Sequence, residues 1–163
     1  MGGSDKQTTA ASEFEILAPV SGELVHLENT NDPAFSSRAV GDGVAVVPQE
    51  GTVCAPVSGT VAALFTTEHA LGIMSDDSSA QVMLHIGIDT VKLEGKGFHA
   101  LVAQGDHVDA GQPLVEVDFD VVRAAGFDPT VFVIVCERSE NSTLREHASG
   151  PVAVKEPVIW LSE

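Results

Sequence analysis

The chain has 163 residues, of which 44% are hydrophobic and 20% are charged, which predicts one domain with a substantial core. Acidic residues outnumber basic residues 24 to 8, and the resulting net charge of −16 argues against a nucleic-acid partner. No stretch is long and apolar enough to form a transmembrane helix, so no direct membrane insertion is expected.

The N-terminus separates from the rest of the chain by composition. Residues 1–12 are small and polar, which predicts a flexible lead-in, and residues 13–163 are expected to form the domain. The first residues contain no apolar core of a signal peptide, so a cytoplasmic location is expected.

Short valine-rich runs separated by Gly, Pro, Asp and Asn predict the fold class. Five such runs occupy residues 43–47, 60–65, 82–86, 113–117 and 131–135. Runs of this length and composition are typical of strands, and their close spacing predicts an all-β antiparallel sandwich or barrel. One or two short helices are expected as well. Asp32 followed by Pro33 is a helix-start signal, and a second helix is expected from Asp118 to Ala125, ending at Gly126.

The chain also repeats itself. The sequence Ala-Pro-Val-Ser-Gly occurs at residues 18–22 and again at 55–59, and Gly-Asp-Gly-Val at 41–44 is echoed by Gly-Asp-His-Val at 105–108. Five identical consecutive residues indicate an internally duplicated β fold, although tight turns can also reuse the same residues. Each Ala-Pro-Val-Ser-Gly segment is expected to turn one strand into the next.

Two histidines stand out from the others. His85 lies in an apolar strand that otherwise contains core residues, and Asp89 would share its face if the strand continued. His69 precedes a second apolar run, and a hairpin between the runs would bring the two histidines side by side. The simplest alternative is that His85 is a core or edge histidine whose hydrogen bonds are satisfied.

A pair of histidines in an apolar setting permits few chemistries. A metal site would need a third ligand, and none is evident nearby. A neutral imidazole can instead attack phosphorus and carry the phosphoryl group, while a second histidine and a hydroxyl donate hydrogen bonds to the phosphoryl oxygens. Thr67, two residues before His69, is the expected hydroxyl.

The stretch His-Ile-Gly-Ile-Asp-Thr-Val-Lys-Leu-Glu-Gly-Lys-Gly-Phe at residues 85–98 carries a family resemblance. Together with residues 18–22, 40–43 and 105–111 it resembles the glucose-type enzyme IIA domain of the bacterial sugar phosphotransferase system. The resemblance covers about residues 13–163. It implies a compact antiparallel β-sandwich with a shallow apolar depression around the two histidines.

The resemblance also implies roles for individual residues. His85 would accept the phosphoryl group, with His69 and Thr67 supporting it and Asp89 near the site. Four residues match positions that line the depression and would form a partner-binding rim: Phe35, Val40, Met83 and Val91. The interval between His69 and His85 is one residue longer than the family pattern, and the polar run at 76–79 is the expected place of the extra residue.

The implied function is phosphoryl relay during sugar uptake. The donor would be the small carrier protein HPr, the acceptor a cysteine of an enzyme IIB domain, and the sugar permease the IIC partner. No cofactor or metal is implied. Two alternatives remain open: a regulatory module whose partner binding depends on phosphorylation of the same face, and a β protein that binds a metal through His69 and His85. The sugar cannot be read from the sequence, nor whether the domain is part of a longer permease.

Overall fold

The computed structural model describes residues 13–163, and the expected lead-in at residues 1–12 lies outside them. The described residues form fourteen strands, two short α-helices and two 3₁₀ turns. The strands are β1 (Glu13–Leu17), β2 (Gly22–His26), β3 (Asp42–Pro48), β4 (Thr52–Cys54), β5 (Gly59–Leu64), β6 (Ala70–Ser75), β7 (Ala80–Ile86), β8 (Phe98–Ala100), β9 (His107–Val108), β10 (Pro113–Val117), β11 (Val131–Arg138), β12 (Thr143–Glu146), β13 (Gly150–Val152) and β14 (Pro157–Ser162). The helices are α2 (Pro33–Ser36) and α3 (Phe119–Ala124), and the turns are η1 (Leu27–Asn29) and η2 (Thr90–Leu93).

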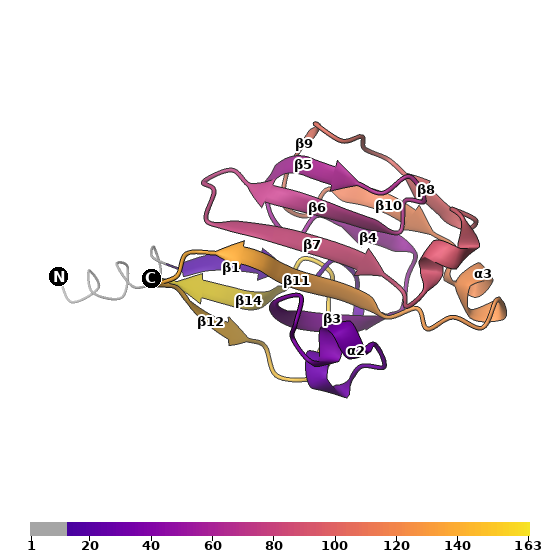
Figure 1. The fold of residues 1–163 in the computed structure, drawn as a ribbon, viewed down its shortest axis with the longest axis horizontal. Helices are drawn as coiled ribbons and strands as arrows, with labels where there is room; N and C mark the ends of the chain where they lie inside the picture. Colours follow the sequence, from indigo (N-terminus) through magenta and orange to yellow (C-terminus); the bar gives the residue numbers. More distant parts are fainter. Residues whose placement is uncertain (1–12) are drawn as a thin grey trace.

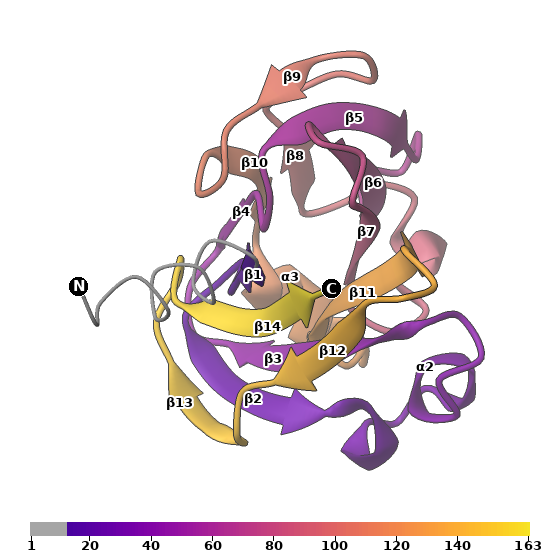
Figure 2. The same ribbon diagram turned by 90° about the vertical axis from the view of Figure 1, so that its left-hand side faces the viewer.

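The strands form one large sheet and two small ones. The large sheet has the order β13-β2-β3-β11-β7-β6-β5-β9, and the small sheets have the orders β1-β14-β12 and β4-β10-β8. All recorded strand pairs are antiparallel. The large sheet curves so that β7 and β11 run across its middle (Figure 1), and in the view of Figure 2 the small sheet β4-β10-β8 lies above the small sheet β1-β14-β12. The expected all-β sandwich is confirmed.

The strand order is symmetric, which supports the predicted duplication. The strands divide into two sets of seven, β4 to β10 and the remaining strands β1, β2, β3, β11, β12, β13 and β14. When each strand of one set is replaced by the strand at the same place in the other set, the large sheet has the same order read from its other end. The same exchange converts one small sheet into the other. One seven-strand unit is therefore continuous, and it is inserted between the third and fourth strands of its counterpart.

The two Ala-Pro-Val-Ser-Gly segments occupy equivalent places in these units. Each turns a strand of a small sheet into a strand of the large sheet, as predicted. The residue before each segment donates to the proline of the other: the Leu17 amide donates to the Pro56 carbonyl at 2.9 Å, and the Cys54 amide donates to the Pro19 carbonyl at 2.8 Å. Both end in glycine for a steric reason: a Cβ on Gly22 or Gly59 would lie 1.9 or 2.0 Å from a backbone oxygen of the neighbouring strand.

The second sequence echo is not part of the duplication. The segment at 41–44 leads into β3, whereas the segment at 105–108 leads into β9. The symmetry pairs β3 with β6 and β9 with β13. One Gly-Asp pair overlaps the start of β3 and the other directly precedes β9, so their resemblance is local.

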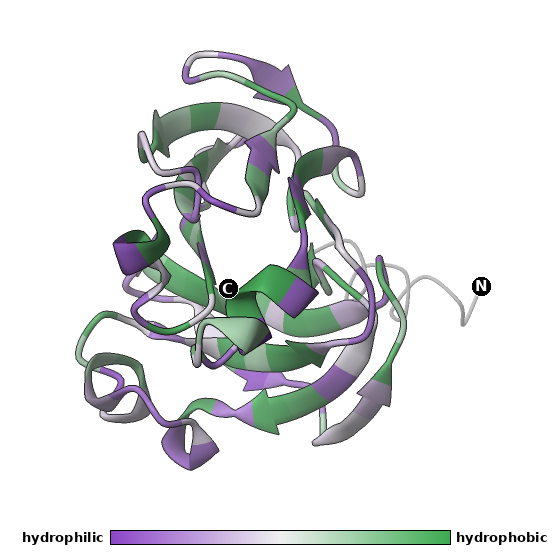
Figure 3. Ribbon diagram, turned by 90° about the vertical axis from the view of Figure 1, so that its right-hand side faces the viewer, coloured by the Kyte–Doolittle hydropathy of each residue, from purple (hydrophilic) through white to green (hydrophobic). Residues whose placement is uncertain are grey.

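The core explains why β11 is apolar at consecutive positions. One face of β11 lies in the main core between the sheets, and its other face, with Phe132 and Ile134, packs in a second cluster with Leu27 and Phe35. The α2 segment therefore covers the outer face of β11. Figure 3 shows hydrophobic stretches along most strands, with hydrophilic residues concentrated in the connections and at the helix ends.

Both helices begin at the predicted caps. The Asp32 carboxylate accepts a hydrogen bond from the Ala34 amide at 2.9 Å and Pro33 occupies the first helical position, while Asp118 caps α3 in the same way. Gly126 follows α3 with a φ of 88°, a left-handed conformation that glycine adopts at helix ends. Within residues 13–163, no helix has the length and apolar character that crossing a bilayer requires.

Candidate functional site

The antiparallel pairing of β6 and β7 brings the two histidines together. His85 is the penultimate residue of β7 and pairs with Ala70, the first residue of β6, so that His69 lies next to it across the sheet. The Ile86 amide donates to the His69 carbonyl at 2.8 Å and continues the ladder. The ring centroids are 5.1 Å apart and the ring planes are inclined at 84°. The hairpin expected from the sequence therefore forms, and the polar run at 76–79 lies in its turn.

Thr67 reaches His69 from a turn, not from a strand. Residues 65–69 connect β5 to β6, with Glu68 in a left-handed conformation at φ 66°. A spacing of two residues would put Thr67 and His69 on one face of a strand, but neither residue lies in a strand. The two side chains still meet, because the turn brings Thr67 Oγ1 within 2.6 Å of His69 Nδ1. His69 is only 2% exposed.

The hydrogen bond at the ring of His85 decides which nitrogen is free. His85 Nδ1 lies 2.8 Å from the carbonyl oxygen of Gly87. A carbonyl oxygen only accepts, so Nδ1 carries the proton and Nε2 carries the lone pair. A second constraint applies to His69: when the Thr67 hydroxyl donates to His69 Nδ1, Nε2 becomes the protonated nitrogen of that ring. The pair can thus present one nucleophilic nitrogen and one donor.

Burial keeps both rings neutral. Desolvation and the neighbouring His85 lower the pKa of His69 to about 4. Desolvation also lowers the pKa of His85, opposed by the Gly87 carbonyl and by the charges of Asp32 and Asp89. A neutral imidazole is the form that has a free lone pair for nucleophilic attack.

Asp89 lies near the site by a different route from the expected one. The strand ends at Ile86, so Asp89 does not share a strand face with His85. Asp89 is exposed, in a left-handed conformation at φ 63°, just before η2. Asp32 is the other carboxylate whose charge acts on His85, and the sequence identified it only as a helix cap. No local signal could place Asp32 beside His85, because the two residues are far apart in the sequence and meet only through the packing of α2.

The expected rim divides into exposed and buried positions. Val40 and Val91 are 39% and 49% exposed, and Met83 is half-buried. Phe35 differs from the expectation, since it is only 5% exposed. It is stacked on Phe132 at a centroid distance of 4.4 Å, and its ring centroid lies 5.3 Å from that of His85. Phe35 is therefore a wall of the site and part of the second core cluster.

One further aromatic residue was missed from the sequence. Phe65 is 51% exposed and its ring lies 5.3 Å from that of His69, at an angle of 81°. It lies at the end of an apolar run, where a buried position was equally consistent with the pattern. Phe65 therefore adds an exposed apolar side chain beside the buried His69.

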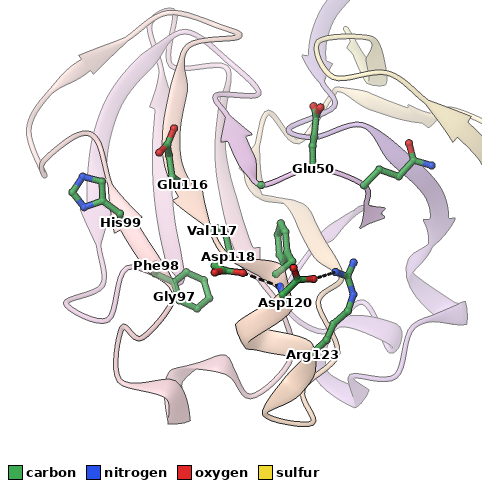
Figure 4. A pocket seen from close by; sticks show the side chains of 12 residues that line it. Glu50, Gly97, Phe98, His99, Glu116, Val117, Asp118, Asp120 and Arg123 are labelled. Carbon is green, nitrogen blue, oxygen red and sulfur yellow. Dashed lines mark hydrogen bonds and ion pairs between the residues drawn. The ribbon is translucent and has the colours of Figure 1, made fainter.

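A large cleft lies elsewhere on the molecule. It has a volume of about 700 Å³ and lies between the loop that joins β3 to β4, strands β8 and β10, and helix α3. Figure 4 shows its acidic lining, with Glu50, Glu116, Asp118 and Asp120, together with Arg123, which pairs with Asp120 at 3.8 Å. Neither His69 nor His85 lines it. Among residues 13–163, no group of three or more His, Cys, Asp or Glu side chains is arranged to hold a metal ion.

The fold and the site define an all-β domain in which two neutral histidines lie side by side, flanked by Phe35 and Phe65. The sequence matches, over residues 14–141, the family model described as phosphoenolpyruvate-dependent sugar phosphotransferase system, EIIA 1. The chain therefore belongs to this EIIA family, as the resemblance in the sequence predicted.

Individual relatives agree with this assignment. The glucose-specific EIIA component of Bacillus cereus is 42% identical, over 88% of this chain and 86% of its own length. The β-glucoside-specific EIIBCA component of Bacillus subtilis is 40% identical over 98% of this chain, but this chain spans only 26% of that larger relative. The solved structure of the glucose permease IIA from Mycoplasma capricolum superposes with a TM-score of 0.83 at 34% identity, covering 91% of this chain and 95% of that one.

Replacement of Phe35 by Ala should destabilise the fold. The side chain is buried against Phe132, so its loss leaves a cavity and should lower the free energy of unfolding by about 3–5 kcal/mol. Phe65→Ala is the matched control: the same change at a half-exposed phenylalanine should alter stability by roughly 0.5 kcal/mol or less. Urea unfolding of both variants measures the difference. Equal, small losses would show that Phe35 does not contribute to the core.

The depressed pKa of His69 predicts a pH dependence of stability. The unfolded chain takes up the proton near pH 6.5, whereas the folded chain takes it up near pH 4. Stability from this residue is fully present above pH 6.5 and is lost as the pH falls towards 4. His69→Gln should therefore lose less stability than the wild type between about pH 7 and about pH 5. Thermal melting of both proteins across this range tests it, and parallel curves would contradict it.

Proposed function

We propose that this domain is a phosphoryl carrier that accepts a phosphoryl group on Nε2 of His85 and passes it to a partner of the same transport system. The observation that carries the proposal is the hydrogen bond from His85 Nδ1 to the Gly87 carbonyl, which leaves Nε2 unprotonated. The proposed donor is the phosphorylated histidine of HPr. The proposed acceptor is a cysteine of an enzyme IIB domain.

The transfer step balances without a cofactor. The lone pair of His85 Nε2 forms a bond to phosphorus as the bond from phosphorus to the donor nitrogen breaks, and that electron pair stays on the donor ring. The phosphorylated ring of His85 then carries a positive charge shared with Nδ1. The Gly87 carbonyl oxygen accepts a hydrogen bond from Nδ1–H and stabilises this charge.

His69 and Thr67 are proposed to stabilise the transferring group. When the Thr67 hydroxyl donates a hydrogen bond to His69 Nδ1, the proton of the His69 ring is on Nε2, and this N–H can donate to a phosphoryl oxygen. The two rings are close enough for one phosphoryl group to contact both, since their centroids are 5.1 Å apart. Because His69 is neutral and buried, its orientation is set before the group arrives.

The surroundings of the site favour a basic partner. Two carboxylates, Asp32 and Asp89, act on His85, and the whole chain carries a net charge of −16. Such a field accelerates encounter with a basic carrier. Around the histidines, the proposed docking rim consists of Val40, Phe65, Met83 and Val91, which are exposed or partly exposed. Apolar contact then excludes water from the transferring group.

The acceptor side is proposed from the relatives. The names of the larger relatives, such as the EIIBCA component of Bacillus subtilis, combine EIIA with B and C parts. We propose that this chain, too, acts in the cytoplasm with such partners: a IIB domain that receives the phosphoryl group and a IIC domain that transports the sugar. A phosphoryl group adds about −1.5 to −2 charges beside Asp32 and Asp89, so partner binding at this face would also report the phosphorylation state.

Replacement of His85 by Ala should abolish phosphoryl acceptance, because the nucleophile is removed. Incubation with phosphorylated HPr followed by intact-mass measurement should add one phosphoryl group to the wild type and none to His85→Ala. His147→Ala is a suitable control, since His147 stacks on Trp160 and does not contact the pair. Full labelling of His85→Ala would refute the assignment.

His69→Gln should give a different result. The phosphoryl group should still load onto His85, but onward transfer to a IIB domain should slow by roughly 10²–10³, the usual cost of losing one transition-state donor. Rapid-quench kinetics with a purified IIB domain measures the transfer step. If His69→Gln failed to load while His85→Ala loaded normally, the roles of the two histidines would be reversed.

A further inference from the structure

The Gly87 carbonyl sets the orientation of His85, so the loop that holds this carbonyl is part of the site. Gly87 adopts a left-handed conformation with φ 81°. A Cβ at this position would lie 2.4 Å from the Thr90 methyl group and 3.1 Å from the Asp128 carbonyl oxygen. The loop is therefore packed tightly against the segment that contains Asp128.

The segment before β11 fixes this loop through its backbone. The Gly87 amide donates to the Thr130 carbonyl at 2.8 Å, and the Ile88 amide donates to the Asp128 carbonyl at 2.9 Å. The position of the Gly87 carbonyl thus depends on residues 128–130. A movement of that segment would move the acceptor of the His85 proton.

The Asp128 side chain forms hydrogen bonds within this segment and with the residue before the α2 cap. One carboxylate oxygen accepts from the Thr130 amide at 2.9 Å and from the Thr130 hydroxyl at 2.5 Å. The other oxygen accepts from the Asn31 amide group at 3.1 Å. Asn31 directly precedes Asp32, the cap of α2, and α2 carries Phe35 to within 5.3 Å of the His85 ring centroid.

The charge state of Asp128 suits this arrangement. Burial opposes ionisation, but the hydrogen bonds from Thr130 and Asn31 outweigh it and hold the pKa of Asp128 below its usual value. The side chain is therefore an ionised carboxylate at neutral pH. In that form it can accept all three hydrogen bonds at once.

We propose that Asp128 is a positioning residue for phosphoryl transfer. It joins the loop after β7, which orients His85, to the α2 segment, which packs Phe35 against the same ring. The carboxylate touches neither histidine and acts only through these two segments. The inference deepens the proposed function, on which its kinetic consequence rests.

The chain contains a matched control. Asp118 caps α3 as Asp128 caps its own turn, by accepting from the Asp120 and Val121 amides. Asp118 lines the acidic cleft, outside the histidine site. Asp118→Ala should therefore lower the melting temperature comparably to Asp128→Ala and leave the site unchanged.

The first measurement needs no partner. Nitrogen chemical shifts of the His85 ring, recorded by NMR on the whole chain, report the fraction of molecules that carry the proton on Nδ1. Asp128→Ala should shift these signals towards a mixture of the two neutral tautomers, and Asp118→Ala should not. Asn31→Ala, at an exposed position where a substitution should cost little stability, should produce a smaller shift in the same direction.

The second measurement follows phosphoryl acceptance from phosphorylated HPr. Asp128→Ala should lower kcat by roughly 10-fold to 100-fold with little change in KM, because the nucleophile is misaligned while the docking rim is intact. Unchanged His85 signals in folded Asp128→Ala would overturn the inference. If that variant does not fold, unchanged signals in Asn31→Ala would overturn it. A wild type that fails to load refutes the proposed function instead, and the tautomer measurement still decides the role of Asp128.

Discussion

The hydrogen bond between His85 Nδ1 and the Gly87 carbonyl is the interaction on which the proposed chemistry depends. It spans only two residues, at 2.8 Å, yet it decides which ring nitrogen has a lone pair. It forms because β7 ends at Ile86 and the chain turns at a glycine in a left-handed conformation. A continued strand would direct the carbonyl of residue 87 into the ladder and leave the proton of His85 without this acceptor.

The surrounding fold keeps this short contact in place from two sides. On one side, β6 aligns His69 beside His85 through regular pairing. On the other side, α2 covers the outer face of β11 and brings Phe35 against the ring. The duplicated architecture makes β11 the counterpart of β7, so the central strand pair is symmetric in topology. Its chemistry is not symmetric, because β7 carries His85 and β11 carries no histidine.

Electrostatics at the site combine two opposing effects. Desolvation lowers the pKa of both histidines, and the charges of Asp32 and Asp89 raise that of His85. Burial dominates, which leaves a neutral nucleophile inside an acidic surface. The same carboxylates that weakly favour protonation also attract a basic partner over a longer range. A more exposed pair of histidines would not be kept neutral, and a less acidic surface would attract a basic partner less strongly.

The sequence by itself determined the class of fold, the family and the paired histidines. Valine-rich strands and the 85–98 segment are local signals, and the hairpin that joins His69 to His85 is short enough for its geometry to follow from strand pairing. Only the tertiary structure decided what surrounds the pair. The burial of Phe35, the proximity of Asp32 and the link from Asp128 to Asn31 each join segments far apart in the chain. Periodicity reports which face of an element is apolar, but not which distant element covers it, and that choice is made by packing.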